Sequence, residues 1–223
     1  MKSLRRWMAP FDELPRDLEE LLRRGGVVIY PTETVYGLGG DPRNAAVLER
    51  IYALKGRPLH KPLPLIASNV ETVQKWVQWR SNPLDRIAKR FWPGPLTLVL
   101  QASMNVPQHL TSKEGTLAVR VSAHPVALLL AEACGGMVVA TSANLSGEAV
   151  VSNPAELSSG LLTEVDGLVD IGPLPPSPPS TILAVAFEGT RYSVQVLRKG
   201  AVSIEALREF FHGELVVSPM EEL

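Results

Sequence analysis

The most informative stretch of the chain covers residues 27–40 and reads Val27-Val28-Ile29-Tyr30-Pro31-Thr32-Glu33-Thr34-Val35-Tyr36-Gly37-Leu38-Gly39-Gly40. Its β-branched start after two glycines is typical of a strand that enters a core. Pro31 cannot donate to a ladder, so we expect the strand to end there or to lie at a sheet edge. The next turn carries two hydroxyls and a carboxylate, and Gly37, Gly39 and Gly40 let the backbone approach another strand or a ligand. The stretch therefore predicts either a plain strand connection or one wall of a binding site.

A basic turn follows the next predicted helix. Lys55, Arg57 and Lys61 lie within seven residues, around one glycine and two prolines. The prolines stiffen the backbone and hold like charges together, which is unfavourable unless an anion binds. A polyphosphate or a carboxylate suits such a turn, because arginine binds these groups with a bidentate fork and lysine as a point charge. A solvated basic turn is the alternative interpretation.

A buried arginine is predicted on the strand at residues 116–121, where apolar and polar residues alternate and Arg120 lies on the polar face. An arginine beside buried neighbours needs a partner, because it cannot lose its charge. Two partners stay open: the carboxylate of Glu33 within the chain, or the carboxylate of an amino-acid substrate.

A polar loop follows the apolar run of residues 137–141, which predicts a buried strand. The loop reads Ser142-Ala143-Asn144-Leu145-Ser146-Gly147. Ligands of open α/β sheets bind at the carboxyl ends of strands, which makes this loop a candidate binding segment. A simple cap or Asx turn is the alternative.

The remaining pattern alternates helices and strands. Apolar spacing predicts helices over residues 11–24, 44–55, 83–91 and 125–134 and in a short segment at 153–162. Asn69 and Ser203 are predicted as the N-caps of two more helices. Strands are predicted at 64–67 and 96–100, a connector at 173–179, and a hairpin through Glu188-Gly189. The cations Arg80, Arg86, Lys89 and Arg90 could face RNA, although a solvated helix face is the commoner meaning of such a run.

Composition excludes several classes of protein. The 223 residues hold 22 Lys+Arg and 23 Asp+Glu, so the net charge is −1 and any RNA contact must be a local patch. One cysteine, Cys134, allows neither an internal disulfide nor a Cys-x-x-Cys metal site. No run is long enough to span a membrane, and the N-terminus lacks a signal-peptide core. Walker A, Gly-x-Gly-x-x-Gly, His-Glu-x-x-His and Gly-x-Ser-x-Gly motifs are also missing.

Several motifs, taken in order, resemble one known family. They are Pro31-Thr32-Glu33-Thr34-Val35-Tyr36-Gly37-Leu38, Lys55-Gly56-Arg57, Trp92-Pro93-Gly94-Pro95, Thr141-Ser142-Ala143-Asn144-Leu145-Ser146-Gly147 and Ser180-Thr181-Ile182. Together they look like the YrdC/Sua5 family, the L-threonylcarbamoyladenylate synthases of tRNA t6A biosynthesis, from about Gly25 to Gly200. The chain departs from the family at Ser122, where proline is usual, and at Ala184, where aspartate is usual.

The resemblance implies an α/β fold: a single YrdC-like domain with a twisted open mixed sheet, flanking helices and a central cleft. We expect this catalytic domain to cover residues 11–212, with terminal extensions at 1–10 and 213–223 and without the second domain of the family's longer members.

The resemblance also implies roles for individual residues. Catalytic roles fall to Lys55, Arg57, Ser142 and Asn144. Threonine binding falls to Thr34, Arg120, His124 and Ser180, and nucleotide binding to Arg57, Lys61, Thr116, Ser142, Asn144 and Arg198. No protein ligand for a metal is implied; Mg²⁺ is expected on the ATP phosphates, held mostly through phosphate and water.

The implied reaction joins L-threonine, bicarbonate and ATP into threonylcarbamoyl-AMP and pyrophosphate, in the cytoplasm. A downstream threonylcarbamoyl transferase complex is the expected partner, with a weak tRNA contact as a further option and no membrane contact. Two alternatives stay open: an RNA-binding module without turnover, and an enzyme that makes another carbamoyl-type adenylate, as in hydrogenase-maturation proteins.

Overall fold

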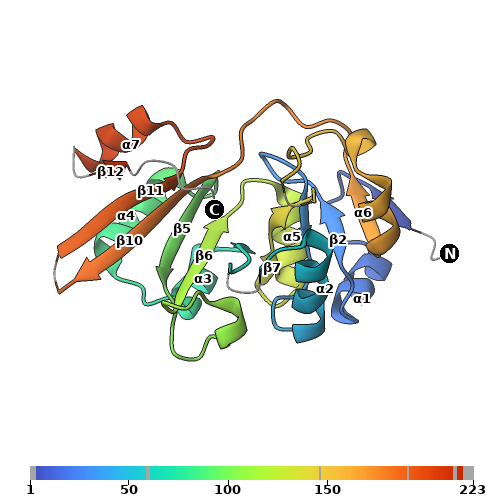
Figure 1. Ribbon diagram of the computed structural model, residues 1–223, viewed down its shortest axis with the longest axis horizontal. Helices are drawn as coiled ribbons and strands as arrows, with labels where there is room; N and C mark the ends of the chain where they lie inside the picture. The colour runs from blue at the N-terminus through green and yellow to red at the C-terminus, as the bar shows by residue number, and fades with distance from the viewer. Residues whose placement is uncertain (1–3, 59–60, 146, 190, 213–214, 218–223) are drawn as a thin grey trace.

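The computed structural model describes residues 4–58, 61–145, 147–189, 191–212 and 215–217, and the strands of these residues form two mixed sheets flanked by helices (Figure 1). The first sheet has the order β1 (Arg5–Met8), β9 (Gly167–Asp170), β2 (Val28–Tyr30), β3 (Gly37–Gly39) and β8 (Thr141–Ser142). The second has the order β12 (Leu215–Val217), β11 (Arg191–Arg198), β10 (Thr181–Glu188), β5 (Leu96–Gln101), β6 (Thr116–Val121), β4 (Leu65–Ala67) and β7 (Met137–Val139).

Most helices fall close to the predicted positions, but the helix predicted over residues 11–24 begins at Arg16, and the segment predicted at 153–162 is divided between a 3₁₀ turn and a short helix. They are α1 (Arg16–Arg23), α2 (Ala45–Lys55), α3 (Val70–Trp76), α4 (Ser81–Phe91), α5 (Pro125–Ala133), α6 (Ser159–Glu164) and α7 (Ile204–Phe211), with short 3₁₀ turns at Gln108–Leu110 and Pro154–Glu156. Both predicted caps form: the side chain of Asn69 accepts from the Thr72 amide at 2.8 Å, and Ser203 from the Ala206 amide at 3.1 Å. No helix among the described residues is long and apolar enough to cross a bilayer.

The mixed α/β fold with flanking helices is confirmed, but its strands are divided between two sheets where we expected one. The division falls within the predicted strand 137–141. Residues Met137–Val139 pair with β4 of the second sheet, whereas Thr141–Ser142 pair with β3 of the first. Ala140 lies between them, and its amide donates to the Pro64 carbonyl at 2.8 Å. One short segment therefore belongs to both sheets and ties them together.

Two glycines of the 27–40 stretch allow backbone segments to pack closely where the two sheets join. A Cβ atom on Gly39 would lie 1.8 Å from the carbonyl oxygen of Val139, and one on Gly40 would lie 2.6 Å from that of Gly26. The Tyr30 hydroxyl donates to the same Val139 carbonyl at 2.7 Å. Of the two alternatives for these glycines, the structure therefore shows the close approach of another backbone segment. As Pro31 predicts, β2 ends at Tyr30.

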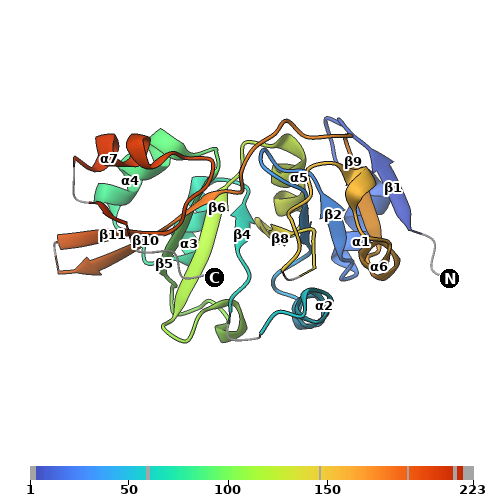
Figure 2. The ribbon, with the colours of Figure 1, turned by 45° about the horizontal axis from the view of Figure 1, so that its top comes forward.

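The described core consists of two apolar clusters, and each cluster draws side chains from both sheets. One cluster gathers α1, α5, β2 and side chains such as Ile66 and Val169, and a larger one extends from Val27 to Phe211 beneath α2, α3, α4 and α7. The proline-rich connector runs from β9 of the first sheet to β10 of the second, as the orange segment in Figures 1 and 2 shows.

The expected terminal extensions contain strands. Residues Arg5–Met8 form β1, which pairs in parallel with β9, and Leu215–Val217 form β12, which pairs with β11. Residues 1–3, 213–214 and 218–223 of these extensions lie outside the described part of the chain. The limits of the catalytic domain, 11–212, stay a prediction.

Candidate functional site

The basic turn and the serine–asparagine loop meet, as the family resemblance implies. Lys55, the last residue of α2, is only 5% exposed. Its ammonium donates to the Ser142 carbonyl at 2.8 Å, to the Asn144 side-chain oxygen at 3.0 Å and to the Asn144 carbonyl. The Ser142 hydroxyl donates to the same Asn144 side-chain oxygen. Three of the four predicted catalytic residues thus form one cluster, although 87 to 89 residues separate Lys55 from the other two.

The end of α2 explains why the basic turn has this position. Gly56 adopts the left-handed conformation with φ 56°, which ends the helix directly after Lys55. Arg57 then folds back over its own turn, where its Nε donates to the Lys61 carbonyl at 3.0 Å and its Nη2 to the Pro62 carbonyl at 3.1 Å. The fourth predicted catalytic residue is therefore fixed half-buried beside the cluster.

The positive charge of this turn also affects the pKa of an arginine in the second sheet. Burial and the charge of Arg57 together lower the pKa of Lys55 to about 8, partly offset by the carboxylate of Glu148. Removal from water and the charge of Arg57 also lower the pKa of Arg198, which ends β11. Arg198 in turn acts on Arg120, whose pKa falls to about 10, chiefly because its guanidinium is buried. Two cations at the end of α2 and two from strands of the second sheet therefore act on one another in succession, an arrangement that favours a polyanionic ligand.

Arg198 is tied to Ser180 at the start of the strand pair. Its Nη2 donates to the Ser180 carbonyl at 2.8 Å and to the Ser180 hydroxyl at 3.1 Å. That hydroxyl also lies 2.9 Å from the Thr97 hydroxyl. Ser180, predicted for threonine, and Arg198, predicted for the nucleotide, are therefore neighbours.

Arg120 has the intramolecular partner that the sequence left open. Its Nη1 donates to Oε1 of Glu33, and the hydroxyl of Ser122 donates to Oε2 of the same carboxylate. Glu33 lies between β2 and β3 of the first sheet, whereas Arg120 belongs to β6 of the second. The ion pair thus joins the two sheets on the side of the predicted threonine residues.

The other predicted threonine residues are close to this pair along the chain. The amide of His124 donates to the Ser122 hydroxyl at 3.2 Å, while the His124 Nδ1 atom is buried and has no hydrogen-bond partner among the described residues. Burial lowers the pKa of His124, which favours the neutral ring. Thr34 follows Glu33 directly and is buried, with its hydroxyl 3.1 Å from that of Thr32.

Two predicted nucleotide residues have other contacts. The Thr116 hydroxyl lies 2.8 Å from that of Ser112, in the loop before its strand. Lys61 contributes its backbone carbonyl, which accepts from Arg57 and, at 3.1 Å, from the hydroxyl of Tyr52. Their roles toward a nucleotide stay predictions.

Sequence reasoning assigned no function to three residues of this region. Glu33 was considered only as an ion-pair partner, and Ser122 only as a departure from the family pattern. Glu148 carries the charge that acts on Lys55, and its backbone carbonyl accepts from the Asn144 amide group. Ser122 lies two residues after Arg120, and that spacing was the signal that could have linked it to the site.

Comparison with known proteins gives consistent matches. The family model for Sua5, YciO and YrdC proteins, described as "Telomere recombination", matches residues 20–200. The threonylcarbamoyl-AMP synthase of Halorhodospira halophila is 45% identical over 148 residues, which cover 66% of this chain and 78% of the relative.

Two solved structures share the fold and part of the sequence. The crystal structure of P. abyssi Sua5 in complex with L-threonine has a TM-score of 0.86 and 31% identity over 98% of this chain; this chain spans 63% of that longer one. E. coli YciO has a TM-score of 0.79 and 26% identity, and the match covers 92% of this chain and 99% of YciO. Because the family model covers most of the chain and the same motifs meet in space, the chain belongs to the Sua5/YciO/YrdC family.

Proposed function

We propose that the chain is an L-threonylcarbamoyladenylate synthase. The observation that carries this proposal is the contact of Lys55 with the Ser142–Asn144 loop, next to the mutually interacting cations Arg57, Arg198 and Arg120. The relatives named threonylcarbamoyl-AMP synthase and the Sua5 structure with L-threonine support the same activity. They favour it over an RNA-binding module without turnover and over a carbamoyl-type adenylate enzyme of another pathway.

The reaction proceeds in two balanced steps. The amine of L-threonine takes up the carbon of bicarbonate to give a carbamate, with loss of water and of the ammonium proton. A carbamate oxygen then attacks the α-phosphate of ATP; the new P–O bond forms as the bond to pyrophosphate breaks, and threonylcarbamoyl-AMP is released. Negative charge accumulates on the phosphates and the carbamate throughout, so a site of fixed cations and hydroxyls can catalyse it by positioning and electrostatic stabilisation.

The residues divide between the substrates accordingly. Arg57, with Lys61 from the same turn, binds the phosphates and bicarbonate, while Ser142 and Asn144, held by Lys55, orient the nucleotide. Arg198 and Thr116 complete the nucleotide side. Thr34, Arg120, His124 and Ser180 bind threonine.

ATP is the substrate, and Mg²⁺ accompanies it. Among the described residues no three His, Cys, Asp or Glu side chains gather into a metal-binding group. The cations Arg57 and Lys61 suit the nucleotide phosphates, and Mg²⁺, if bound, would be held mostly by those phosphates and by water. Such a metal would supply electrostatic stabilisation of the negative charge on the phosphates.

Substrate omission tests the proposal. Pyrophosphate release by the purified chain is measured with L-threonine, bicarbonate and ATP together and with each one left out. We expect release only with all three, and an adenylate that incorporates ¹³C from labelled bicarbonate by mass spectrometry. Release that does not depend on threonine or bicarbonate contradicts the proposal.

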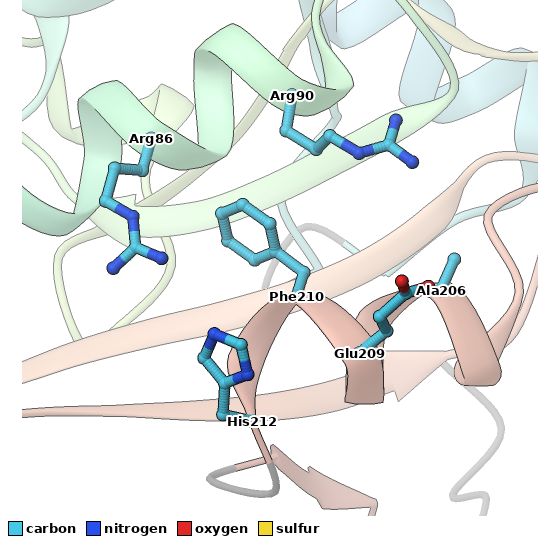
Figure 3. Close-up of a pocket in the computed structure, with 6 residues that line it drawn as sticks. All are labelled: Arg86, Arg90, Ala206, Glu209, Phe210 and His212. Atoms are coloured by element: carbon cyan, nitrogen blue, oxygen red, sulfur yellow. The ribbon is translucent and has the colours of Figure 1, made fainter.

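The product is a mixed anhydride that must be passed to a tRNA, so a downstream threonylcarbamoyl transferase is the expected partner in the cytoplasm. A direct RNA contact would use the α4 patch, formed by Arg80, Arg86, Lys89 and Arg90, which are mostly solvent-exposed. Figure 3 shows Phe210 of α7 between Arg86 and Arg90. These three residues line a hollow of about 280 Å³.

The arginines of the α4 patch already have structural partners. The guanidinium carbons of Arg86 and Arg90 lie 5.4 Å and 5.2 Å from the rings of Phe210 and Phe91, which are themselves packed edge to face. Such stacking stabilises the packing of α7 on α4 without any RNA. RNA affinity that falls steeply with salt and is lost in Arg86→Ala/Arg90→Ala supports a contact here; unchanged affinity leaves the patch with its packing role.

A further inference from the structure

Glu33 is a carboxylate that contacts one of the predicted threonine residues, Arg120, and directly precedes another, Thr34. Its Oε1 accepts from Arg120 and its Oε2 from Ser122. The Glu33 side chain is 16% exposed, against 8% for that of Arg120. The carboxylate is therefore held in a defined orientation while part of it stays within reach of a ligand.

Both members of the ion pair have bonding capacity left over. An ionised carboxylate offers about four acceptor positions, and the contacts with Arg120 and Ser122 occupy two. A guanidinium carries five N–H donors in a planar fork, and the contact with Glu33 engages one. The N–H donors of Arg120 that Glu33 does not engage are thus sufficient in number for a second carboxylate.

An amino acid requires both charges at its site. L-threonine brings a carboxylate and an ammonium on neighbouring atoms, and burying either without a partner of opposite sign is costly. Arg120 supplies the positive partner, and the nearby Arg198 adds to it. Of the described contacts of the predicted threonine residues, the one with Glu33 brings the negative charge. The backbone amide of His124 shares the Ser122 hydroxyl with Glu33, and the buried Nδ1 of His124 has no hydrogen-bond partner among the described residues.

We propose that Glu33 binds the α-ammonium group of the amino-acid substrate and, together with Arg120, selects a zwitterion over a simple hydroxy acid. Ser122 is the positioning residue that orients the Glu33 carboxylate, a task that proline, usual at this position in the family, could not perform by a side-chain hydrogen bond. This inference rests on the proposed function, because it takes threonine as the substrate.

Calorimetric titration of two ligands tests the proposal. L-threonine and 3-hydroxybutyrate share the carboxylate and the hydroxyl, but the latter lacks the ammonium. Each is titrated into the wild-type chain and into Glu33→Gln, which keeps the shape and removes the charge. We expect Glu33→Gln to weaken threonine binding about tenfold or more, as for a lost hydrogen bond between charged groups, and to change 3-hydroxybutyrate binding less than about threefold.

Two further variants keep the test decisive if Glu33→Gln does not fold, which circular dichroism and thermal melting will show. Ser122→Ala leaves the charge in place, and we expect it to weaken threonine binding several-fold and to spare the analogue. Arg120→Lys should weaken both ligands, because both carry the carboxylate. Equal losses for both ligands in Glu33→Gln or Ser122→Ala, or no loss for either, overturn the proposal.

The test separates this inference from the proposed function. Selective loss of threonine binding without any pyrophosphate release in the wild-type chain would leave Glu33 as the ammonium partner and refute the synthase activity. Normal pyrophosphate release with equal effects on the two ligands would support the synthase activity and refute Glu33 as the ammonium partner.

Discussion

Replacing Lys55 by methionine removes a charge from the centre of the site and keeps most of the aliphatic stem. The carbonyl oxygens of Ser142 and Asn144 and the Asn144 side-chain oxygen then lose their donor. The side-chain oxygen retains the Ser142 hydroxyl as a second donor, so two acceptors carry the main cost. At about 1–3 kcal/mol for each buried unsatisfied acceptor, the loss is roughly 2–6 kcal/mol before compensation.

Removal of the buried ammonium also has a stabilising effect, because the cost of its desolvation is lost. Its desolvation, visible in the lowered pKa of Lys55, no longer opposes folding. We therefore expect a net loss of about 2–4 kcal/mol in the free energy of unfolding. For a chain of this size, that lowers Tm by roughly 5–15 °C.

Thermal melting and urea titration followed by circular dichroism measure this effect. Lys61→Met is the matched control, because it removes the same group from the same turn. Among the described contacts of Lys61, the backbone carbonyl is the part that binds, so the control should change stability by less than about 0.5 kcal/mol. A Lys55→Met chain that melts with the wild type, or together with Lys61→Met, would refute the reasoning.

Three further predictions follow from the same geometry. Lys55 is charged below its pKa of about 8, so kcat/KM for ATP should fall as pH rises through that value, and Lys55→Arg should flatten this profile; an identical fall in both enzymes speaks against Lys55 as the titrating group. Arg57→Ala should lower pyrophosphate release at least about 100-fold, because it removes a cation from the developing charge, while Tm shifts by only a few degrees; normal turnover contradicts that role. Gly39→Ala should destabilise the chain by about 2 kcal/mol or more in urea titration, because the new Cβ would meet the Val139 carbonyl at 1.8 Å; wild-type stability argues against a tight junction between the sheets.

Local features were predictable because a few residues determine them. The hydroxyl or amide of a cap residue needs only the first turn of its own helix, and the caps at Asn69 and Ser203 form as expected. Pro31 ends β2 because it has no amide hydrogen to donate. The contact between Lys55 and the serine–asparagine loop is not local; the resemblance to a family predicted it, and apolar spacing alone would not have.

The division into two sheets was not predictable from periodicity. Residues 137–142 carry no glycine or proline at the point where the chain changes partners, so they resemble one continuous strand. The change depends on contacts from distant residues, such as the Pro64 carbonyl that binds the Ala140 amide.

The partner of Arg120 illustrates a second limit. The sequence named both Glu33 and a substrate carboxylate, and composition cannot rank an internal ion pair against a ligand. The structure shows the pair with Glu33 and, through Ser122 and His124, the polar surroundings that an amino acid would need.

The central claim is that the basic turn, the serine–asparagine loop and the Arg120 ion pair bind one nucleotide and one amino acid side by side where the two sheets meet. A crystal structure of the chain with L-threonine and a non-hydrolysable ATP analogue tests it most directly. We predict phosphates within hydrogen-bonding distance of Arg57 and Ser142, and the threonine carboxylate on Arg120. A nucleotide bound elsewhere, such as the hollow between α4 and α7, or an amino acid far from the phosphates, would contradict the account.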